Sequence, residues 1–271
     1  MRPLPWPHAL VALALLGVGL VAPWITRRSA EGLRLSVPAL PGDGALLTTP
    51  GGRHVLIDGG ADGTALVTWL GSRLPIGQRS LAALILTRAD AATVPGQLAV
   101  LRRYRIGAAL GAAGAEGEAA TAWRERLAAQ GAPVHLLDAG QHFALDDCLF
   151  TTLHAQAGRL ALQARCAATQ LYFLQSIDDA GAQVLAEQAL EPAGAVLYPW
   201  RRAPDRALLE RLQPSVIIFG EGDQGQAELS LYERRIGTAR LLHEALHGQI
   251  ELRDRGTGLE LHLARGAEYG H

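Results

Sequence analysis

The sequence predicts an α/β protein with two β-sheets and flanking helices, arranged as a sandwich of four layers. Three observations predict it. Short apolar segments separated by glycine-rich turns alternate with amphipathic stretches from Leu33 onward. A series of strands followed by alternating strands and helices occurs twice in succession, which indicates two sheets rather than one. With 271 residues, 49% of them hydrophobic, the chain can form a large buried core.

The first half is expected to begin with a hairpin, because Thr49-Pro50-Gly51-Gly52 is a turn sequence between two apolar segments. The continuous apolar run 81–87 is typical of a strand buried on both faces. The expected strands are 33–37, 44–49, 53–57, 81–87, 107–111 and 133–137, and the expected helices are 62–72, 94–104 and 116–130.

The second half is expected to begin with a meander of three strands, 148–154, 159–166 and 170–176. The remaining expected strands are 194–199, 215–220, 239–243, 248–253 and 258–263, and the expected helices are 179–190 and 204–212. A turn at Ala157-Gly158 would place Cys148 nearly opposite Cys166, where either a disulfide or two buried thiols would fit.

The amino terminus carries an uncharged apolar run, residues 9–26, close to the minimum length of a membrane-spanning helix. Trp6 and Trp24 flank this run and Arg27-Arg28 follows it, as is common at membrane interfaces. We therefore expect residues 1–32 to form a single-pass membrane anchor with a short linker, followed by one domain over 33–271. A cleaved signal peptide is the alternative. Basic residues nearly balance across the run, so the positive-inside rule favours neither orientation.

The overall charge argues against a large nucleic-acid-binding surface. The formal net charge is -1, and all 25 basic residues are arginine. Any contact with nucleic acid would therefore have to be local.

The segment Leu56-Ile57-Asp58-Gly59-Gly60 resembles the opening of the metallo-β-lactamase domain of ComEC-type competence proteins, which take up DNA. The order of the later segments is also similar, over roughly residues 33–264. The resemblance implies a four-layer αββα sandwich in which Asp58, Gly59 and Gly60 mark the fold. In that family, His and Asp residues bind one or two zinc ions that activate water.

The zinc-binding positions implied by the resemblance carry other residues here. The family's His-x-His-x-Asp-His loop aligns with Arg88, Asp90, Ala92 and Thr93. Its Pro-His-His-Gly-Ser segment aligns with residues 199–203, which include Arg201 and Arg202. Of the family's Thr-Gly-Asp segment, only the Asp is kept here, as Asp178. A late loop of the family supplies a further His, and this chain has Gln226 at that position. Asp90 and Asp178 are too few for a usual zinc site, so we expect no zinc cofactor and assign no catalytic residue.

Arg88, Arg201 and Arg202 stand where the family binds cations. Arginine stays charged and only donates hydrogen bonds, so it would repel a metal ion. These arginines could pair with Asp90 and Asp178, which would preserve the fold without adding a function. They could instead bind an anion, such as a phosphate of nucleic acid or of a nucleotide.

These features favour a membrane-anchored, non-hydrolytic protein that acts as a binding or scaffolding component, with DNA uptake or the cell envelope as its setting and a protein partner in a membrane complex. ComEC-type proteins also have a polytopic membrane region, so a transport role would need a separate channel subunit. The main alternative is a hydrolase of the nuclease or phosphodiesterase type, with an unconventional metal site built from Asp90, Asp178 and Asp223.

A second alternative comes from His243-Glu244-Ala245-Leu246-His247, which matches the H-E-x-x-H motif of zinc proteases. In that motif both histidines lie on one face of a helix and the glutamate acts as a base. Residues 248–252 indicate a turn and a strand directly afterwards, and no third ligand follows at metzincin spacing. His243 and His247 remain candidate zinc ligands under this alternative.

Overall fold

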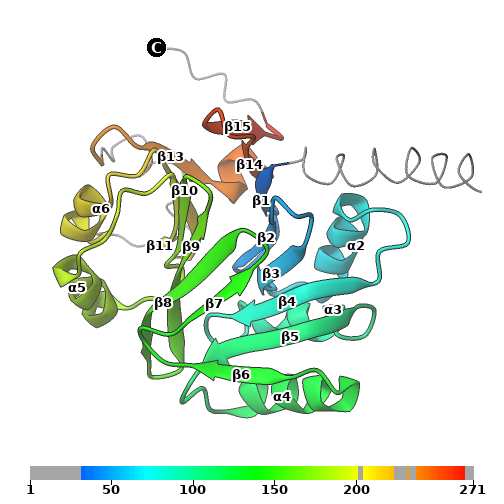
Figure 1. The fold of residues 1–271 in the computed structure, drawn as a ribbon. Helices are drawn as coiled ribbons and strands as arrows, with labels where there is room; N and C mark the ends of the chain where they lie inside the picture. Colours follow the sequence, from blue (N-terminus) through cyan, green and yellow to red (C-terminus); the bar gives the residue numbers. More distant parts are fainter. Residues whose placement is uncertain (1–31, 201–203, 223–230, 232–235, 266–271) are drawn as a thin grey trace, which may run out of the picture.

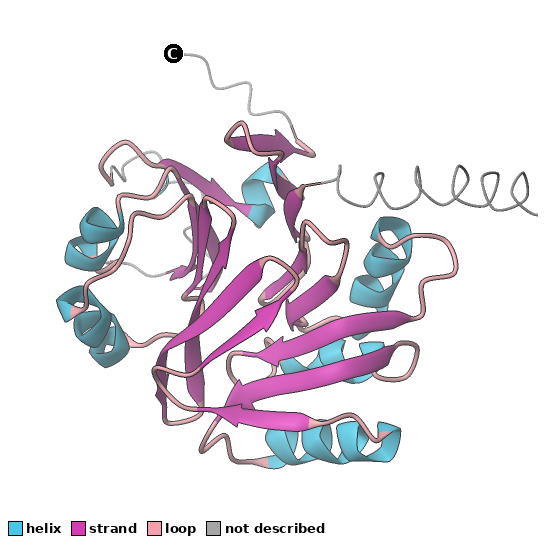
Figure 2. Ribbon diagram, viewed as in Figure 1, coloured by secondary structure: helices cyan, strands magenta, loops and turns pink. Residues whose placement is uncertain are grey.

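The computed structural model describes residues 32–200, 204–222, 231 and 236–265. Two sheets face each other across a common core, and helices cover the outer face of each sheet (Figures 1 and 2). The predicted α/β sandwich of two sheets is confirmed.

The first sheet has eight strands, in the order β15-β14-β1-β2-β3-β4-β5-β6. Parallel pairing links β3, β4, β5 and β6, and antiparallel pairing links the other neighbours. Its strands are β1 (Leu33–Val37), β2 (Gly44–Thr48), β3 (His54–Asp58), β4 (Ser80–Leu86), β5 (Arg105–Ala112), β6 (Val134–Leu137), β14 (Ile250–Asp254) and β15 (Leu259–Leu263). The helices packed on its outer face are α2 (Gly63–Arg73), α3 (Val94–Val100) and α4 (Glu118–Gln130).

The second sheet has seven strands, in the order β13-β12-β11-β10-β9-β8-β7. Its strands are β7 (His142–Leu145), β8 (Cys148–Gln156), β9 (Arg159–Cys166), β10 (Thr169–Phe173), β11 (Ala195–Trp200), β12 (Val216–Gly222) and β13 (Arg240–His243). Helices α5 (Asp179–Glu187) and α6 (Arg206–Leu212) pack on its outer face, and the single turn α8 (Glu244–His247) follows β13.

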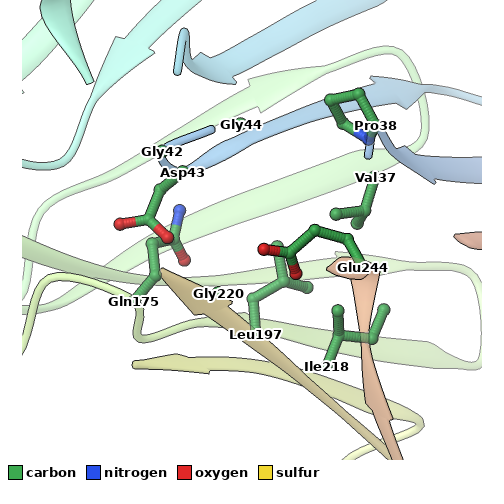
Figure 3. Close-up of a pocket in the computed structure, with 10 residues that line it drawn as sticks. All are labelled: Val37, Pro38, Gly42, Asp43, Gly44, Gln175, Leu197, Ile218, Gly220 and Glu244. Atoms are coloured by element: carbon green, nitrogen blue, oxygen red, sulfur yellow. The ribbon is translucent and has the colours of Figure 1, made fainter. Parts of the chain in front are cut away.

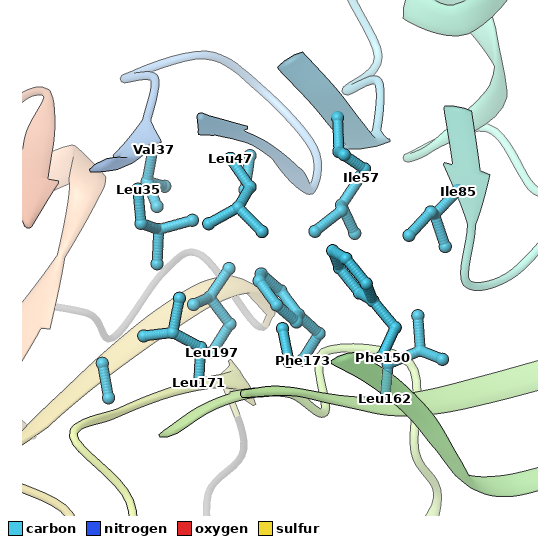
Figure 4. Packing of buried hydrophobic residues seen from close by; sticks show 14 of the residues in the cluster. Leu35, Val37, Leu47, Ile57, Ile85, Phe150, Leu162, Leu171, Phe173 and Leu197 are labelled. Carbon is cyan, nitrogen blue, oxygen red and sulfur yellow. The ribbon is translucent and has the colours of Figure 1, made fainter. Parts of the chain in front are cut away.

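The main core fills the space between the two sheets. Leu47 and Ile57 of the first sheet face Phe150 and Phe173 of the second, and all four side chains are fully buried (Figure 4). Alternate residues of each strand therefore point into this core, while the opposite faces pack against the helices. This arrangement leaves the strand ends and the loops that follow them free to form a site.

Cys148 and Cys166 are cross-strand partners on β8 and β9 and form a disulfide. Of the two outcomes expected from the sequence, the bridge is the one observed. Both residues are buried within the core between the sheets.

The sequence did not predict strand β7. Its pattern, His142-Phe143-Ala144-Leu145, alternates in burial, and the Phe143 ring stacks on Phe150 with centroids 4.6 Å apart. Asp146-Asp147, between two apolar segments, was the signal for this hairpin, because Asp tolerates the positive φ of 51° found at Asp146.

No helix within the described ranges has the length and apolar content needed to cross a bilayer. The predicted anchor in residues 1–32 falls almost wholly outside those ranges.

Candidate functional site

The buried carboxylate of Asp58 connects the end of one strand with the loops that follow two other strands. Asp58 is the last residue of β3, and both of its carboxylate oxygens accept hydrogen bonds from Thr87, which directly follows β4. These bonds come from the backbone N–H at 2.8 Å and from the hydroxyl at 2.6 Å. The amide Nε2 of Gln175, just after β10, donates to the same carboxylate at 3.0 Å. Asp58 therefore ties the two sheets together beneath the loops.

Burial dominates the electrostatics of Asp58. Removing the carboxyl from water raises its pKa to about 6, although the bonds from Thr87 and Gln175 and the charge of Arg88 act in the opposite direction. The carboxylate is thus held in place by neutral donors, and at neutral pH it remains an acceptor.

Arg88, in the loop after β4, forms ion pairs with two carboxylates. Its Nη2 atom lies 3.0 Å from Oδ2 of Asp43, and its Nε atom lies 2.6 Å from Oδ2 of Asp90. The Asp43 side chain is almost fully buried, whereas that of Asp90 is 44% exposed. Asp90 also accepts from the backbone N–H of Ala92 at 2.9 Å, so the pair braces the loop.

Gly59 and Gly60, the fold markers of the sequence, lie where two backbones pass very close together. The N–H of Gly96, in the first turn of α3, donates to the oxygen of Gly60 at 3.1 Å. A Cβ added to Gly96 would lie 1.6 Å from the oxygen of Gly59. Only glycine at position 96 allows α3 to begin against the Asp58 turn.

Asp178 belongs to a different local arrangement. It is the N-cap of α5, where its carboxylate accepts from the N–H of Gly181 at 2.8 Å, and its other oxygen lies 3.8 Å from Nε of Arg159. The bond from Gly181 is the largest cause that lowers the pKa of Asp178, and the charges of Arg159 and His154 add to it. The sequence analysis expected Asp178 to pair with Arg88, Arg201 or Arg202, whereas its described partner is Arg159, which the sequence did not single out.

The H-E-x-x-H segment does not lie on one helix. His243 ends β13, and only residues 244–247 form a helical turn. Nδ1 of His243 accepts from the N–H of Ala245 at 3.1 Å, and Nδ1 of His247 lies 3.0 Å from the backbone oxygen of His243. Burial lowers the pKa of His243 to about 4, so its imidazole is neutral. The two imidazoles serve local backbone contacts, which is not the shared helical face that a zinc protease needs.

No family model and no curated protein sequence matches this chain. Several solved structures are similar to it. The metallo-β-lactamase fold protein YhfI from Bacillus subtilis superposes with a TM-score of 0.56 at 12% identity, over 78% of this chain and 96% of that one. The chain has a metallo-β-lactamase fold.

Two other proteins with similar structures are enzymes that catalyse different reactions. CmlA, a diiron β-hydroxylase from Streptomyces venezuelae, matches with a TM-score of 0.55 at 14% identity, over 83% of this chain. This chain spans 54% of the length of CmlA. A diphosphatase of the PhnP family matches with a TM-score of 0.51 at 12% identity, over 81% of this chain and 97% of that one. The shared metallo-β-lactamase fold therefore assigns no reaction by itself.

The residues that the structure describes do not fit a zinc site. Within the described part of the chain, no three His, Cys, Asp or Glu side chains are grouped so that they could hold a metal ion. Asp90 is engaged by the permanently charged Arg88, and Asp178 caps a helix. Arg201, Arg202, Asp223 and Gln226 lie outside the described residues.

Sequence reasoning missed Asp43 and Gln175 as members of this site. Asp43 is separated from Arg88 by 45 residues, and Gln175 is separated from Asp58 by 117. Neither residue belongs to a motif. Asp43 stands between Gly42 and Gly44, and this local sequence does not identify a partner.

Proposed function

We propose that this protein uses the metallo-β-lactamase fold for binding or scaffolding, and not for metal-dependent hydrolysis. The observation that carries the proposal is the position of Arg88. It occupies the loop after β4 that would supply metal ligands, and its guanidinium is held between the carboxylates of Asp43 and Asp90. A fixed cation at this point replaces a metal ion as the charge that neutralises the loop.

The two ion pairs of Arg88 also bear on what the site binds. Of the three arginines expected there, Arg88 is the one that the structure describes, and its charge is balanced by two carboxylates. This balance supports ion pairing as the role of Arg88 over the binding of phosphate or nucleic acid.

Metal analysis of the purified full chain, together with hydrolysis assays, tests the proposal. We expect less than stoichiometric zinc, manganese or iron, and no metal-dependent cleavage of phosphodiester or β-lactam substrates. Stoichiometric metal, with turnover that disappears in Asp90→Asn or Asp178→Asn, would establish the hydrolase alternative instead.

Removing the guanidinium tests its structural role. Arg88→Met leaves the buried Asp43 carboxylate without this cation, so we expect a loss of about 2–3 kcal/mol in the free energy of unfolding. Arg53→Met is the matched control, because Arg53 is 61% exposed beside Asp146. The control should cost under about 1 kcal/mol. Equal losses measured by urea denaturation would argue against Arg88 as the brace of the loop.

We further propose that the apolar run 9–26 anchors the domain to a membrane, in a cell-envelope or DNA-uptake setting suggested by the ComEC resemblance. The Cys148–Cys166 disulfide supports placing the domain outside the reducing cytosol. If thiols are trapped directly from cells under denaturing conditions, we expect labelling of both cysteines only after reduction. Two labelled thiols without reduction would place the domain in the cytosol.

A further inference from the structure

A small pocket has Asp43 in its lining (Figure 3). The same Asp43 carboxylate forms the ion pair with Arg88. It occupies about 310 Å³ including its open mouth, and both sheets contribute to its lining. The space that a water-sized group can reach within it is about 20 Å³, far below the volume of a whole small-molecule site, so the pocket can admit only the end group of a ligand.

Gln175 presents a buried acceptor to this pocket. The residue is 2% exposed, and its Nε2 atom donates to Asp58. Because the Asp58 carboxylate only accepts, the amide nitrogen must face it, and the amide oxygen must face away from it. The Oε1 atom of Gln175 has no hydrogen-bond partner among the described residues. A buried acceptor in this state is costly unless a donor reaches it.

Two carboxylates line the same space. The side chains of Asp43 and Glu244 extend toward the region occupied by the Gln175 amide, from opposite sides of the pocket (Figure 3). Both carboxylates make other contacts within the protein, and each oxygen can accept more than one hydrogen bond. None of the ten described lining residues is basic. Arg88 already pairs with Asp43 from outside the pocket, so the charge that favours a cation comes chiefly from Glu244, and the oxygens of Asp43 and Gln175 favour a ligand rich in donors.

Gly220 keeps one wall of the pocket open around Asp43. A Cβ added to Gly220 would lie 2.2 Å from Oδ1 of Asp43. The remaining walls include the apolar side chains of Val37, Leu197 and Ile218. The pocket thus combines an acceptor-rich end with hydrocarbon walls.

We propose that this pocket binds the primary ammonium group of a small organic cation, with its first carbons against Val37, Leu197 and Ile218. The proposal names a ligand class for the binding function proposed above and rests on it. An ammonium group carries three donors, which match the Gln175 oxygen and the two carboxylates. A divalent ion of the Mg²⁺ or Ca²⁺ type needs six or more oxygen ligands, and the apolar walls offer too few.

The test is a titration of the full chain with n-propylammonium at neutral pH, followed by NMR and calorimetry in the presence of EDTA. We expect saturable binding of propylammonium, and none of n-propanol or propionate, which match it in size but lack the positive charge. Nuclear Overhauser contacts should connect the ligand methylenes with the methyl groups of Val37 and Ile218.

Glu244→Gln removes one charge while preserving side-chain shape, and we expect it to weaken propylammonium binding about tenfold or more. Glu260→Gln on β15 is the matched control, because Glu260 is exposed and lies outside the pocket, and it should bind like the wild type.

Absence of propylammonium binding, equal affinity in Glu244→Gln, or displacement by equimolar Mg²⁺ or Ca²⁺ in a parallel titration without EDTA would each overturn the proposal. If Glu244→Gln does not fold, the Overhauser contacts in the wild type decide. The titration contains EDTA, so a lack of propylammonium binding would refute only the ligand proposal. Metal-dependent hydrolysis, measured in a separate assay, would refute the proposed function.

Discussion

Asp58 shows how one buried residue can hold the loops of a site together. Its carboxylate is fully buried and joins β3, the loop after β4 and the loop after β10. The residue also adopts a positive φ of 53°, which Asp tolerates better than most residues. Its donors are neutral, so its ionisation is penalised by burial and only partly compensated.

This environment predicts a specific pH dependence. The Asp58 pKa is about 6 in the folded protein, against 3.8 for the ordinary value. The folded state holds the proton more tightly, so the stabilisation is fully present below pH 3.8 and is lost as the pH rises through 6. Between pH 7 and pH 4, the unfolding free energy of the wild type relative to Asp58→Asn should rise by up to about 3 kcal/mol.

Urea denaturation of both proteins at constant ionic strength measures this difference. Asp147→Asn, in an exposed turn, is the control and should track the wild type at every pH. A flat difference for Asp58→Asn would mean that the carboxyl titrates alike in the folded and unfolded states.

At the residue scale, the sequence predicted part of the site. The pair of Arg88 with Asp90 follows from two residues in one loop, which short-range reasoning can reach. Asp178 was expected in the same cluster, but the helix that begins at residue 179 uses it as a cap, a role that Asp favours. Asp43 and Gln175 enter through contacts between distant segments, which no local pattern specifies.

At the element scale, the apolar runs of the central strands made their positions predictable. Strand β4 was expected at 81–87 and occupies Ser80–Leu86, because a strand buried on both faces needs continuous apolar residues. Helix α3 was expected to reach 104 but ends at Val100, and residues 101–103 form turns instead. Short β7 was missed because four residues give too little alternation to detect.

The start of α3 offers a sharp test of packing between elements. Gly96→Ala would place a methyl group on the Gly59 oxygen, so we expect a loss of about 3 kcal/mol or more, or failure to fold. Gly71→Ala, at an exposed position of helix α2 with no atom within 4 Å of the added carbon, should instead stabilise by about 0.5–1 kcal/mol.

Thermal and urea unfolding of the two glycine variants measure the contrast. A tolerated alanine at position 96 would show that α3 can shift away from the Asp58 turn without loss.

At the scale of the whole molecule, the disulfide links two neighbouring strands inside the core between the sheets. It closes a loop with a sequence separation of 18 residues, for which chain entropy predicts about 3 kcal/mol of stabilisation. The double variant Cys148→Ala with Cys166→Ala should lose about this amount in urea denaturation. Because both sulfur-bearing residues are buried, reductant should act on the native protein only as fast as it unfolds.

Wild-type protein unfolded without reductant is the control and should expose no thiol. Rapid reduction of the folded protein would instead indicate that β8 and β9 open locally.

The close approach of Gly96 to Gly59 has a consequence for how sequences of this kind are interpreted. The Asp-Gly-Gly turn is required by the seating of a helix and by a buried carboxylate, and neither requirement involves metal or substrate. A protein can therefore carry this signature whether or not it carries metal ligands. Detecting Asp-Gly-Gly after a strand identifies an architecture, and the chemistry must be judged from the side chains of the loop that follows the next buried strand.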